Sequence, residues 1–335
     1  MPAQDRRVIL DKSFIQTESK ESRRLHLLSD AGCVFILTDM LIYELCTDSL
    51  TTQWPSTQRK LFPFADRIEV WRHTAELLKS EITDQTPIIS PIDRESTDRV
   101  RVWFKGGKVY VPGNLPAIGK SAFQQREVDT VDALISDCRR LCAIDPTYTA
   151  KILKGGEPAK ASLANLMGRK DLTEFLIKRD HGNPEDQELY INGAEQGLGS
   201  EWFAYHNARS TLALYCVFMS KYGLANMPGR DFRHTKLDSD YAALLNYADG
   251  LATNETSGSL ADVCEWLYGG AKKIFSTGSL DATLPTADEI RLEAYRKWER
   301  DGGTHWHDQA DWFWAKQNLD AQLWERLGST RTTKS

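Results

Sequence analysis

The chain has 335 residues, with 41% hydrophobic and 27% charged residues, values that are ordinary for a globular protein and too apolar for a disordered one. The N-terminus lacks the apolar stretch of a signal peptide, and the most apolar later segment, residues 211–219, is far too short to span a bilayer. Six scattered cysteines give no paired zinc or disulfide pattern, so we expect core thiols in a cytoplasmic protein.

The net charge of −5 argues against a nucleic-acid-binding surface over the whole molecule, but the charge is unevenly distributed. Residues 99–170 contain 13 Lys or Arg and six Asp or Glu, so this stretch carries +7 and the remainder −12. A basic middle between acidic ends suits a metal-dependent nuclease, because carboxylates hold cations and cations hold phosphates. A solvated basic face without function is the alternative.

The first 50 residues predict a βαβ unit. Residues 7–11 read as a short buried strand that ends in an acid, and a polar helix follows over residues 20–31. Residues 34–37 form a second buried strand, and Thr38 and Asp39 then provide the N-cap of a helix that runs to about residue 48. Two strands with a helix between them predict a parallel sheet.

Two features stand out in the next part of the chain. Residues 55–80 predict two helices, the second with Ile68, Trp71, Ala75 and Leu78 on one face. Residues 100–111, two β-rich runs around a Gly-Gly pair, predict a β-hairpin with lysines at its tip. Later in the chain we expect helices over residues 128–142, 202–222, 237–247 and 260–268, and strands over residues 250–253 and 273–275.

Acidic residues stand at or just after the ends of the predicted strands and at the start of a helix that precedes one of them. They are Asp11, Asp39, Glu44, Asp238, Asp240 and Glu255. Parallel α/β sheets bind ligands at the carboxyl ends of their strands, so these acids are expected at one edge. Each acid alone is more often a cap or turn residue. Together they would raise one another's pKa, and a divalent cation would relieve that repulsion.

These segments resemble the sequence blocks of PIN domains. Residues 8–13, an apolar strand followed by Asp-Lys-Ser, resemble the opening of that family, and residues 35–45, a strand and an acid-bearing helix, resemble its second block. Asp238-Ser-Asp240 is similar to the third-acid block, and residues 247–255, which end in Thr-Asn-Glu, are similar to the fourth. The resemblance covers about a quarter of the chain.

The resemblance implies an α/β fold: a PIN-like three-layer sandwich with a central parallel sheet. Because 194 positions separate Glu44 from Asp238, we expect a large, mainly helical insertion between the two parts of this domain. The expected division of the chain is a first PIN-like part at residues 1–84, the insertion at 85–230, a second PIN-like part at 231–280 and a C-terminal helical hairpin at 285–328.

The resemblance also implies a nuclease dependent on Mg²⁺ or Mn²⁺, most simply an endoribonuclease, in which a metal-activated water attacks a phosphodiester in line. The implied metal acids are Asp11, Glu44, Asp238 and Glu255, with Asp240 as a further catalytic acid. We expect the first three of these acids to converge. Glu255 stands where the family commonly has Asp. Ser13 and Thr253 would position ligands or a phosphate.

Nucleic acid is the expected partner, RNA rather than DNA, with no membrane involved. Substrate phosphates would be held by the basic residues Lys151, Lys154 and Lys160 in a glycine-containing stretch. A toxin or defence effector would fit this activity, and a protein partner or inhibitor and a homodimer are left open.

Two other functions are left open. A catalytically inactive PIN-like scaffold, binding nucleic acid or protein, would use the same acids merely as helix caps. A phosphatase of the haloacid dehalogenase type also has an Asp at the end of its first strand, but it needs an acid two residues on, where this chain has Ser13.

The C-terminal segment predicts a helical hairpin. Ile290, Ala294 and Trp298 follow a helical spacing, a Gly-Gly pair comes next, and a second apolar stripe follows over residues 312–319. The segment resembles a short bacterial domain family of unknown function, which implies no mechanism. The nearby His305 and His307 could bind a metal, although a surface or capping role is the stronger reading.

Overall fold

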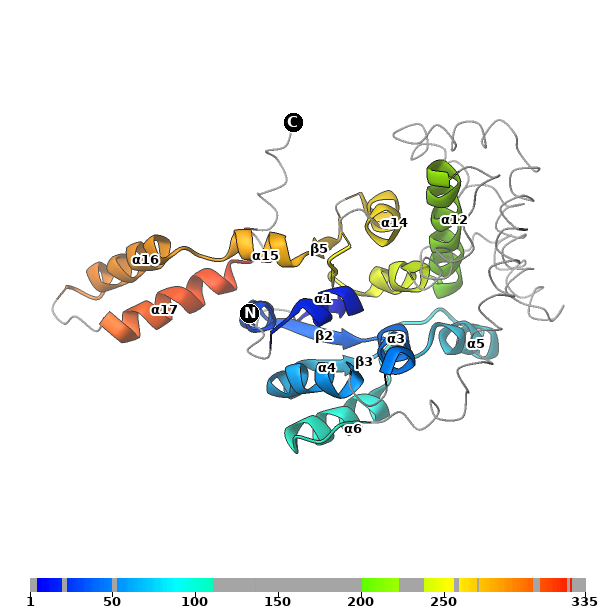
Figure 1. The fold of residues 1–335 in the computed structure, drawn as a ribbon, viewed down its shortest axis with the longest axis horizontal. Helices are drawn as coiled ribbons and strands as arrows, with labels where there is room; N and C mark the ends of the chain where they lie inside the picture. Colours follow the sequence, from blue (N-terminus) through cyan, green and yellow to red (C-terminus); the bar gives the residue numbers. More distant parts are fainter. Residues whose placement is uncertain are drawn as a thin grey trace.

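A five-stranded parallel sheet forms the centre of the protein, with the strand order β3-β2-β1-β4-β5 (Figure 1). The computed structural model describes residues 5–19, 23–49, 53–110, 136, 201–222, 238–255, 259–269, 271–303, 308–323 and 326. The strands are β1 (Arg6–Leu10), β2 (Cys33–Leu37), β3 (Ile68–Val70), β4 (Gly250–Ala252) and β5 (Lys273–Phe275). The predicted α/β class with a central parallel sheet is therefore confirmed.

The two ends of the chain meet at the middle of this sheet. Val8 of β1 lies opposite Phe35 of β2 on one side and opposite Gly250 of β4 on the other. All five residues of β2 are buried, so helices and loops cover both faces of the sheet at this strand. The carboxyl ends of β1 and β4 consequently lie side by side, although more than 200 residues separate them in the sequence.

The helices of the N-terminal part follow the expected order, with one addition. They are α1 (Lys12–Thr17), α2 (Arg23–Asp30) and α3 (Asp39–Ser49). The side chain of Thr38 accepts a hydrogen bond from Leu41 N at 3.2 Å and so caps α3, as the sequence indicates. Gly32 has a φ of +81° in the turn between α2 and β2. Helix α1, which starts directly after β1, was not predicted.

The segment that follows contains a strand where the sequence predicted a helix. Helix α4 (Gln53–Leu61) continues into the 3-10 helix η1 (Phe62–Arg67), and then β3 precedes α5 (Thr74–Asp84). The apolar spacing from Ile68 to Leu78 mimics a helix, but its first part belongs to the strand. Strand β3 gains its hydrogen bonds from β2 and from the Thr97 side chain, which accepts from Val70 N at 2.9 Å.

The predicted β-hairpin at residues 100–111 is wrong, because residues 100–105 belong to helix α6 (Arg94–Lys105). Asp93 caps the helix by accepting from Ser96 N at 2.9 Å. Thr97, Val100 and Phe104 are its buried residues, a spacing of one helical face. The glycine pair ends this helix instead of turning a hairpin. The helix forms despite the β propensity of the run because its apolar face is buried.

The C-terminal half of the sheet follows the predicted elements. They are α12 (Phe203–Tyr222), an unlabelled helix described over residues 238–244, η2 (Leu245–Tyr247) and α14 (Ser259–Tyr268), with β4 before α14 and β5 after it. Helix α15 (Thr277–Thr283), which follows β5, was not predicted. Most of the insertion predicted for residues 85–230 lies outside the described residues, and its described parts contain the helices α6 and α12.

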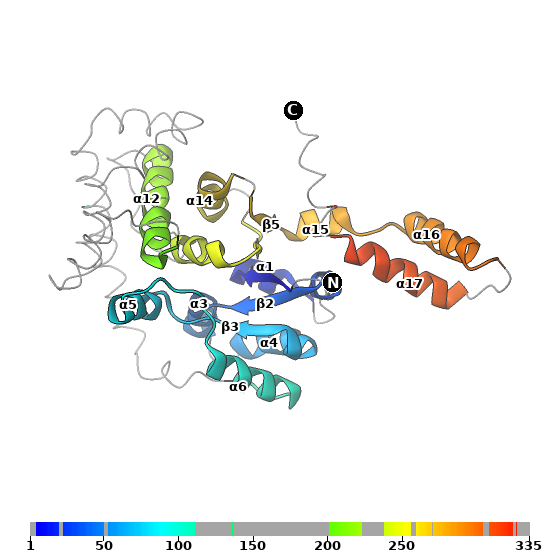
Figure 2. The ribbon, with the colours of Figure 1, turned by 180° about the vertical axis from the view of Figure 1, so that it is seen from behind.

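The C-terminal segment forms the predicted pair of packed helices, α16 (Ala287–Arg300) and α17 (Asp308–Ala321). The pair extends away from the sheet, with the far end of α17 returning toward α2 (Figures 1 and 2). Gly303 has a φ of +66°, and a Cβ there would lie 3.4 Å from the Trp298 ring, so the turn needs a glycine. Lys297 joins the helices through Asp311 at 2.7 Å.

Three buried cysteines, Cys33, Cys216 and Cys264, form no disulfide, in agreement with the predicted core thiols. Within the described part of the chain, no helix is both long enough and apolar enough to cross a membrane.

Candidate functional site

Asp11 lies at the carboxyl end of β1, where it is 5% exposed and caps α1. Its Oδ2 accepts hydrogen bonds from Ser13 N at 3.3 Å, from the Ser13 hydroxyl, and from the Thr253 hydroxyl at 2.8 Å. Burial raises the pKa of Asp11, and these hydrogen bonds oppose that rise because they favour the carboxylate. The carboxylate is therefore held in one orientation by hydroxyls from two distant segments.

Glu44, from the second turn of α3, faces the same edge. The Tyr241 hydroxyl donates a hydrogen bond to Glu44 Oε2 at 3.1 Å. Burial, and next the neighbouring charge of Asp11, raise the pKa of Glu44 to about 7, and Glu255 adds to the rise. The charges of Asp11 and Glu255, two further predicted acids from other segments, thus act on Glu44.

Asp39 has two charged or titratable neighbours, His73 and Asp240. His73 Nε2 lies 3.0 Å from Asp39 Oδ2, while His73 Nδ1 accepts from Ala75 N at 2.9 Å, so Nε2 carries the proton of the neutral ring. Burial and the charge of Asp240 raise the pKa of Asp39 well above its ordinary range. His73 was missed by sequence reasoning because it follows β3, the strand that the sequence did not reveal.

Asp238 and Asp240 lie in the helix described over residues 238–244, and each is 8% exposed. The charge of Asp240 acts on Asp39, as described above. Asp238 lies near Cys264 of α14, whose thiol has a pKa raised mainly by burial and further by the Asp238 charge. The convergence of Asp238 with Asp11 and Glu44 stays a prediction.

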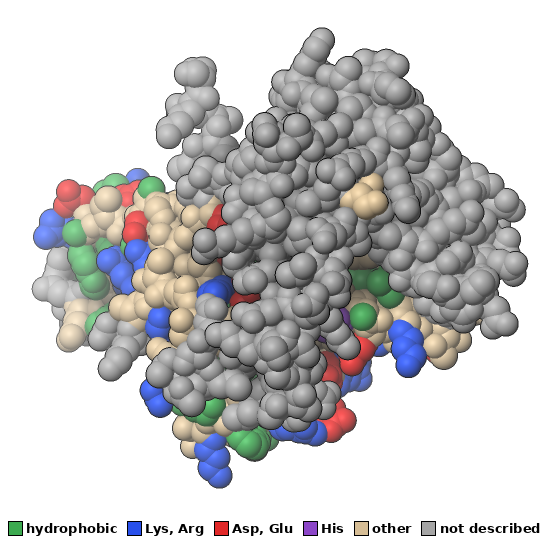
Figure 3. Space-filling view, turned by 45° about the vertical axis from the view of Figure 1, so that its right-hand side comes forward, with side chains coloured by type: hydrophobic (Ala, Val, Ile, Leu, Met, Phe, Trp, Pro, Cys, Tyr) green, Lys and Arg blue, Asp and Glu red, His purple; other side chains and the backbone are tan. Residues whose placement is uncertain are grey.

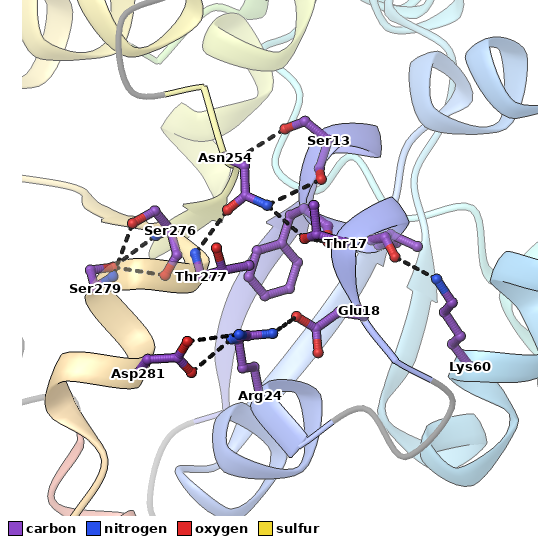
Figure 4. A network of polar contacts seen from close by, with 12 residues as sticks. Ser13, Thr17, Glu18, Arg24, Lys60, Asn254, Ser276, Thr277, Ser279 and Asp281 are labelled. Atoms are coloured by element: carbon purple, nitrogen blue, oxygen red, sulfur yellow. Dashed lines mark hydrogen bonds and ion pairs between the residues drawn. The ribbon is translucent and has the colours of Figure 1, made fainter.

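Ser13 and Thr253, whose hydroxyls were predicted to position ligands or a phosphate, both contact Asp11. Ser13 and Thr253 both donate to Asp11, and the Ser13 hydroxyl also accepts from Asn254 N at 2.9 Å. Asn254 then joins three elements: its amide nitrogen donates to Thr17 Oγ1 at 2.6 Å and to Ser13 O at 3.2 Å, and its amide oxygen accepts from Thr277 N at 2.8 Å (Figure 4). Asn254 was not singled out from the sequence.

A nearby ion-pair network joins the same elements. Arg24 of α2 contacts Glu18 Oε1 at 2.9 Å and Asp281 Oδ2 of α15 at 2.7 Å, as Figure 4 shows. Glu18 is 4% exposed, so this pair is shielded from water. Together with Asn254, the network links the segments after β1, β4 and β5, and it thereby stabilises the edge that carries Asp11.

The PIN resemblance implies a Mg²⁺ or Mn²⁺ site formed by Asp11, Glu44, Asp238 and Glu255. In the ranges that the structure describes, no group of three or more His, Cys, Asp or Glu side chains is arranged to hold a metal ion. Mg²⁺ commonly binds proteins through only one or two carboxylates and retains several waters. Asp11 and Glu44, two neighbouring oxygen donors, fit that smaller requirement, while Asp238 and Glu255 as further ligands stay predictions.

The proposed substrate lysines Lys151, Lys154 and Lys160 lie outside the described residues, as do His305 and His307. The basic residues of the mistaken hairpin lie on or after α6. Lys105 pairs with Asp66 and Arg99 pairs with Glu95, so these charges are partly neutralised. On the face drawn in Figure 3, the described basic and acidic side chains are intermixed instead of forming a patch of one sign.

Comparison with known proteins bears on the C-terminal helix pair. Residues 285–321 match the family model described as "Protein of unknown function (DUF2934)". This match confirms the resemblance of the hairpin to a family of unknown function, and it covers α16 and α17 only. No curated protein and no solved structure matches the chain. No PIN family model matches either, so the PIN resemblance rests on the quoted residues and the parallel sheet.

Proposed function

We propose that this protein is a nuclease that uses Mg²⁺ or Mn²⁺ to hydrolyse phosphodiester bonds, with RNA as the favoured substrate. The proposal is supported above all by the grouping of Asp11, Glu44 and Glu255, which come from three separate segments. Burial, and next the charges of Asp11 and Glu255, raise the pKa of Glu44 to about 7, so its ionisation destabilises the folded state as the pH rises through that value. A divalent cation held by these carboxylates would relieve the repulsion between them.

The residues of the chain have separate roles in this proposal. Asp11 and Glu44 would hold the ion, because each is an oxygen donor whose orientation is already set by hydroxyl partners. A bound Mg²⁺ would supply an activated water and neutralise charge on the phosphate. Ser13 and Thr253 would position Asp11 instead of the phosphate. The substrate backbone would be held by Lys151, Lys154 and Lys160.

The test is cleavage of labelled RNA and DNA by the purified protein with Mg²⁺, with Mn²⁺ and with a chelator. We expect metal-dependent cleavage that Asp11→Asn reduces by at least about 100-fold, since this change removes the charge but keeps an oxygen that accepts from Ser13 and Thr253. Asp93→Asn is the matched control, because the Asp93 side chain also caps a helix, and that helix, α6, carries none of the predicted acids.

The outcomes separate the alternatives. Equal cleavage by wild type and Asp11→Asn, or cleavage that persists in the chelator, would contradict the proposal. Loss of activity in Asp93→Asn as well would point to a general folding defect instead of a site. Circular dichroism and thermal unfolding of both variants show whether each one is folded.

A catalytically inactive scaffold is the second candidate, and one observation favours it. Asp11 caps α1 and accepts hydrogen bonds from the Ser13 and Thr253 hydroxyls. These contacts are enough to explain an aspartate here by a structural role. On this alternative the protein binds nucleic acid or protein without cutting. Salt-dependent RNA binding with no cleavage in either metal would favour the scaffold over the nuclease.

A further inference from the structure

An open cleft of about 340 Å³ lies along α5. Polar and charged residues from one face of this helix line the cleft, together with the arginine that precedes the helix: Arg72, Glu76, Lys79, Ser80, Thr83 and Asp84. The Arg72 side chain contacts Ser80, and Lys79 is the neighbour of Ser80 in the sequence, so the two cations belong to the middle of the cleft. The acids stand about one helical turn away on either side.

The cleft begins at the edge of the sheet that carries the predicted acids. Arg72 is the second residue after β3, which runs parallel to β2, and β2 runs parallel to β1. The next residue, His73, contacts Asp39 at 3.0 Å. Neighbouring strands lie about 4.8 Å apart, so the end of β3 is about 10 Å from the end of β1 and from Asp11. A nucleic-acid strand at the acids is therefore close enough to reach Arg72 as well.

The Arg72 guanidinium is fixed by neutral groups. Its Nη1 donates to Ser80 Oγ at 3.1 Å and its Nη2 donates to Ser90 O at 3.1 Å. Among the residues that the structure describes, no carboxylate forms an ion pair with it, and its buried Nε has no acceptor. A guanidinium has five N–H donors. The contacts to Ser80 and Ser90 alone would suit a structural arginine, but they leave a partly buried charge without a counter-ion.

Lys79 adds a second cation to the cleft. It is exposed, and it makes no hydrogen bond or ion pair with any other residue in the described part of the chain. Ser80, beside it, accepts from Arg72 and still has its own hydroxyl proton to donate. Glu76 and Asp84 would repel an extended run of phosphates on this face of α5. The middle of the cleft therefore suits a single phosphate.

We propose that Arg72 and Lys79 bind one backbone phosphate of the substrate strand, next to the acids that would hold the metal ion. This inference deepens the proposed nuclease function and rests on it. Arginine offers several N–H donors of fixed geometry to phosphate oxygens, and lysine offers a point charge. Such a contact carries no sequence preference, and it fixes the position of the strand relative to Asp11 and Glu44.

The test compares Arg72→Gln, Lys79→Gln and the double variant with Arg101→Gln. Arg101 is the matched control, because it is a partly buried arginine that donates to Ile68 O at 2.8 Å, at the opposite end of β3. Fluorescence anisotropy measures the affinity for a labelled single-stranded RNA over a range of salt, in a chelator that keeps the strand uncut. Each single variant should weaken binding by about 10-fold, and the double variant should reduce the slope of log Kd against log salt by about 1. Arg101→Gln should leave both near wild type.

Cleavage kinetics with Mg²⁺ give a second readout. The cleft contacts the substrate away from the reacting atoms, so Arg72→Gln and Lys79→Gln should raise KM for RNA by about 10-fold and leave kcat near wild type. A variant that merely loses folded protein lowers kcat and leaves KM unchanged. If Arg72→Gln fails to fold without its contacts to Ser80 and Ser90, Lys79→Gln decides, because Lys79 has no such contact to a described residue.

The failures are distinguishable. Wild-type protein that neither binds nor cuts nucleic acid refutes the proposed function, and the role of the cleft with it. Wild-type protein that binds and cuts, with both cleft variants no different from Arg101→Gln in affinity, salt slope and KM, overturns the role of Arg72 and Lys79 alone. In that case the nuclease proposal stands.

Discussion

Replacing Glu44 with Gln tests the electrostatics of the acidic group without any assumption about catalysis. Burial and the charges of Asp11 and Glu255 raise the pKa of Glu44 to about 7 in the folded protein, from an ordinary value of 4.5. The folded state therefore holds a proton that the unfolded state releases between these values, and stability falls as the pH rises through that window. Gln cannot ionise, and its oxygen can still accept from Tyr241.

The magnitude follows from the shift. The rise from 4.5 to about 7, at about 1.4 kcal/mol for each pKa unit, gives an upper limit of about 3.5 kcal/mol. Because Glu44 is only partly buried, solvent screens part of this energy, and about 2 kcal/mol is the expected gain. Glu44→Gln should match wild type below about pH 4.5 and exceed its free energy of unfolding by that amount at pH 8.

The assay is urea unfolding of both proteins from pH 4.5 to pH 8 in a chelator, so that no divalent ion compensates the charge. Glu95→Gln is the control, because the Glu95 side chain is 82% exposed on α6 and should show no gain that grows with pH. A stability difference for Glu44→Gln that is independent of pH, or a loss at pH 8, would refute the reasoning about the acidic group.

Two further predictions concern the rest of the molecule. Glu81 is fully buried and accepts backbone hydrogen bonds from Phe203 and Ala204 at the start of α12. Glu81→Ala should therefore lower the free energy of unfolding by about 2–4 kcal/mol in urea titrations, and Glu81→Gln should lower it less. The triple variant Lys151/Lys154/Lys160→Ala should bind RNA more weakly, about equally across sequences, and the salt dependence of its affinity should be flatter. If the affinity falls with salt as steeply as in wild type, these lysines bind a protein partner instead.

The long apolar runs of this chain were sufficient to predict its main strands and helices. The strands β1, β2, β4 and β5, and the helices α3, α12 and α14, match the predicted elements, because a buried parallel strand is apolar throughout and a capped helix has a recognisable start. The C-terminal helix pair was equally readable. These are local patterns that need no knowledge of the partner segments.

Two elements were misread for a common reason. The strand β3 is three residues long, and its apolar residues continue the spacing of the helix that follows. Helix α6 contains Val-Arg-Val-Trp-Phe, residues with high β propensity, and it is a helix because Val100 and Phe104 pack into the core. In both cases the tertiary environment decided between two local conformations of similar energy.

Patterns along the chain were enough to find the acids and the strands that end beside them. They predict Asp11, Glu44 and Glu255 at one edge, because parallel strands that alternate with helices share the direction of their carboxyl ends. The partners of these acids became known only from the fold: Asp11 accepts from the Thr253 hydroxyl and Glu44 from the Tyr241 hydroxyl, each from the other end of the chain. A hydrogen bond extends about 3 Å, and no periodicity along a sequence specifies distances of that size between segments that meet only in the folded state.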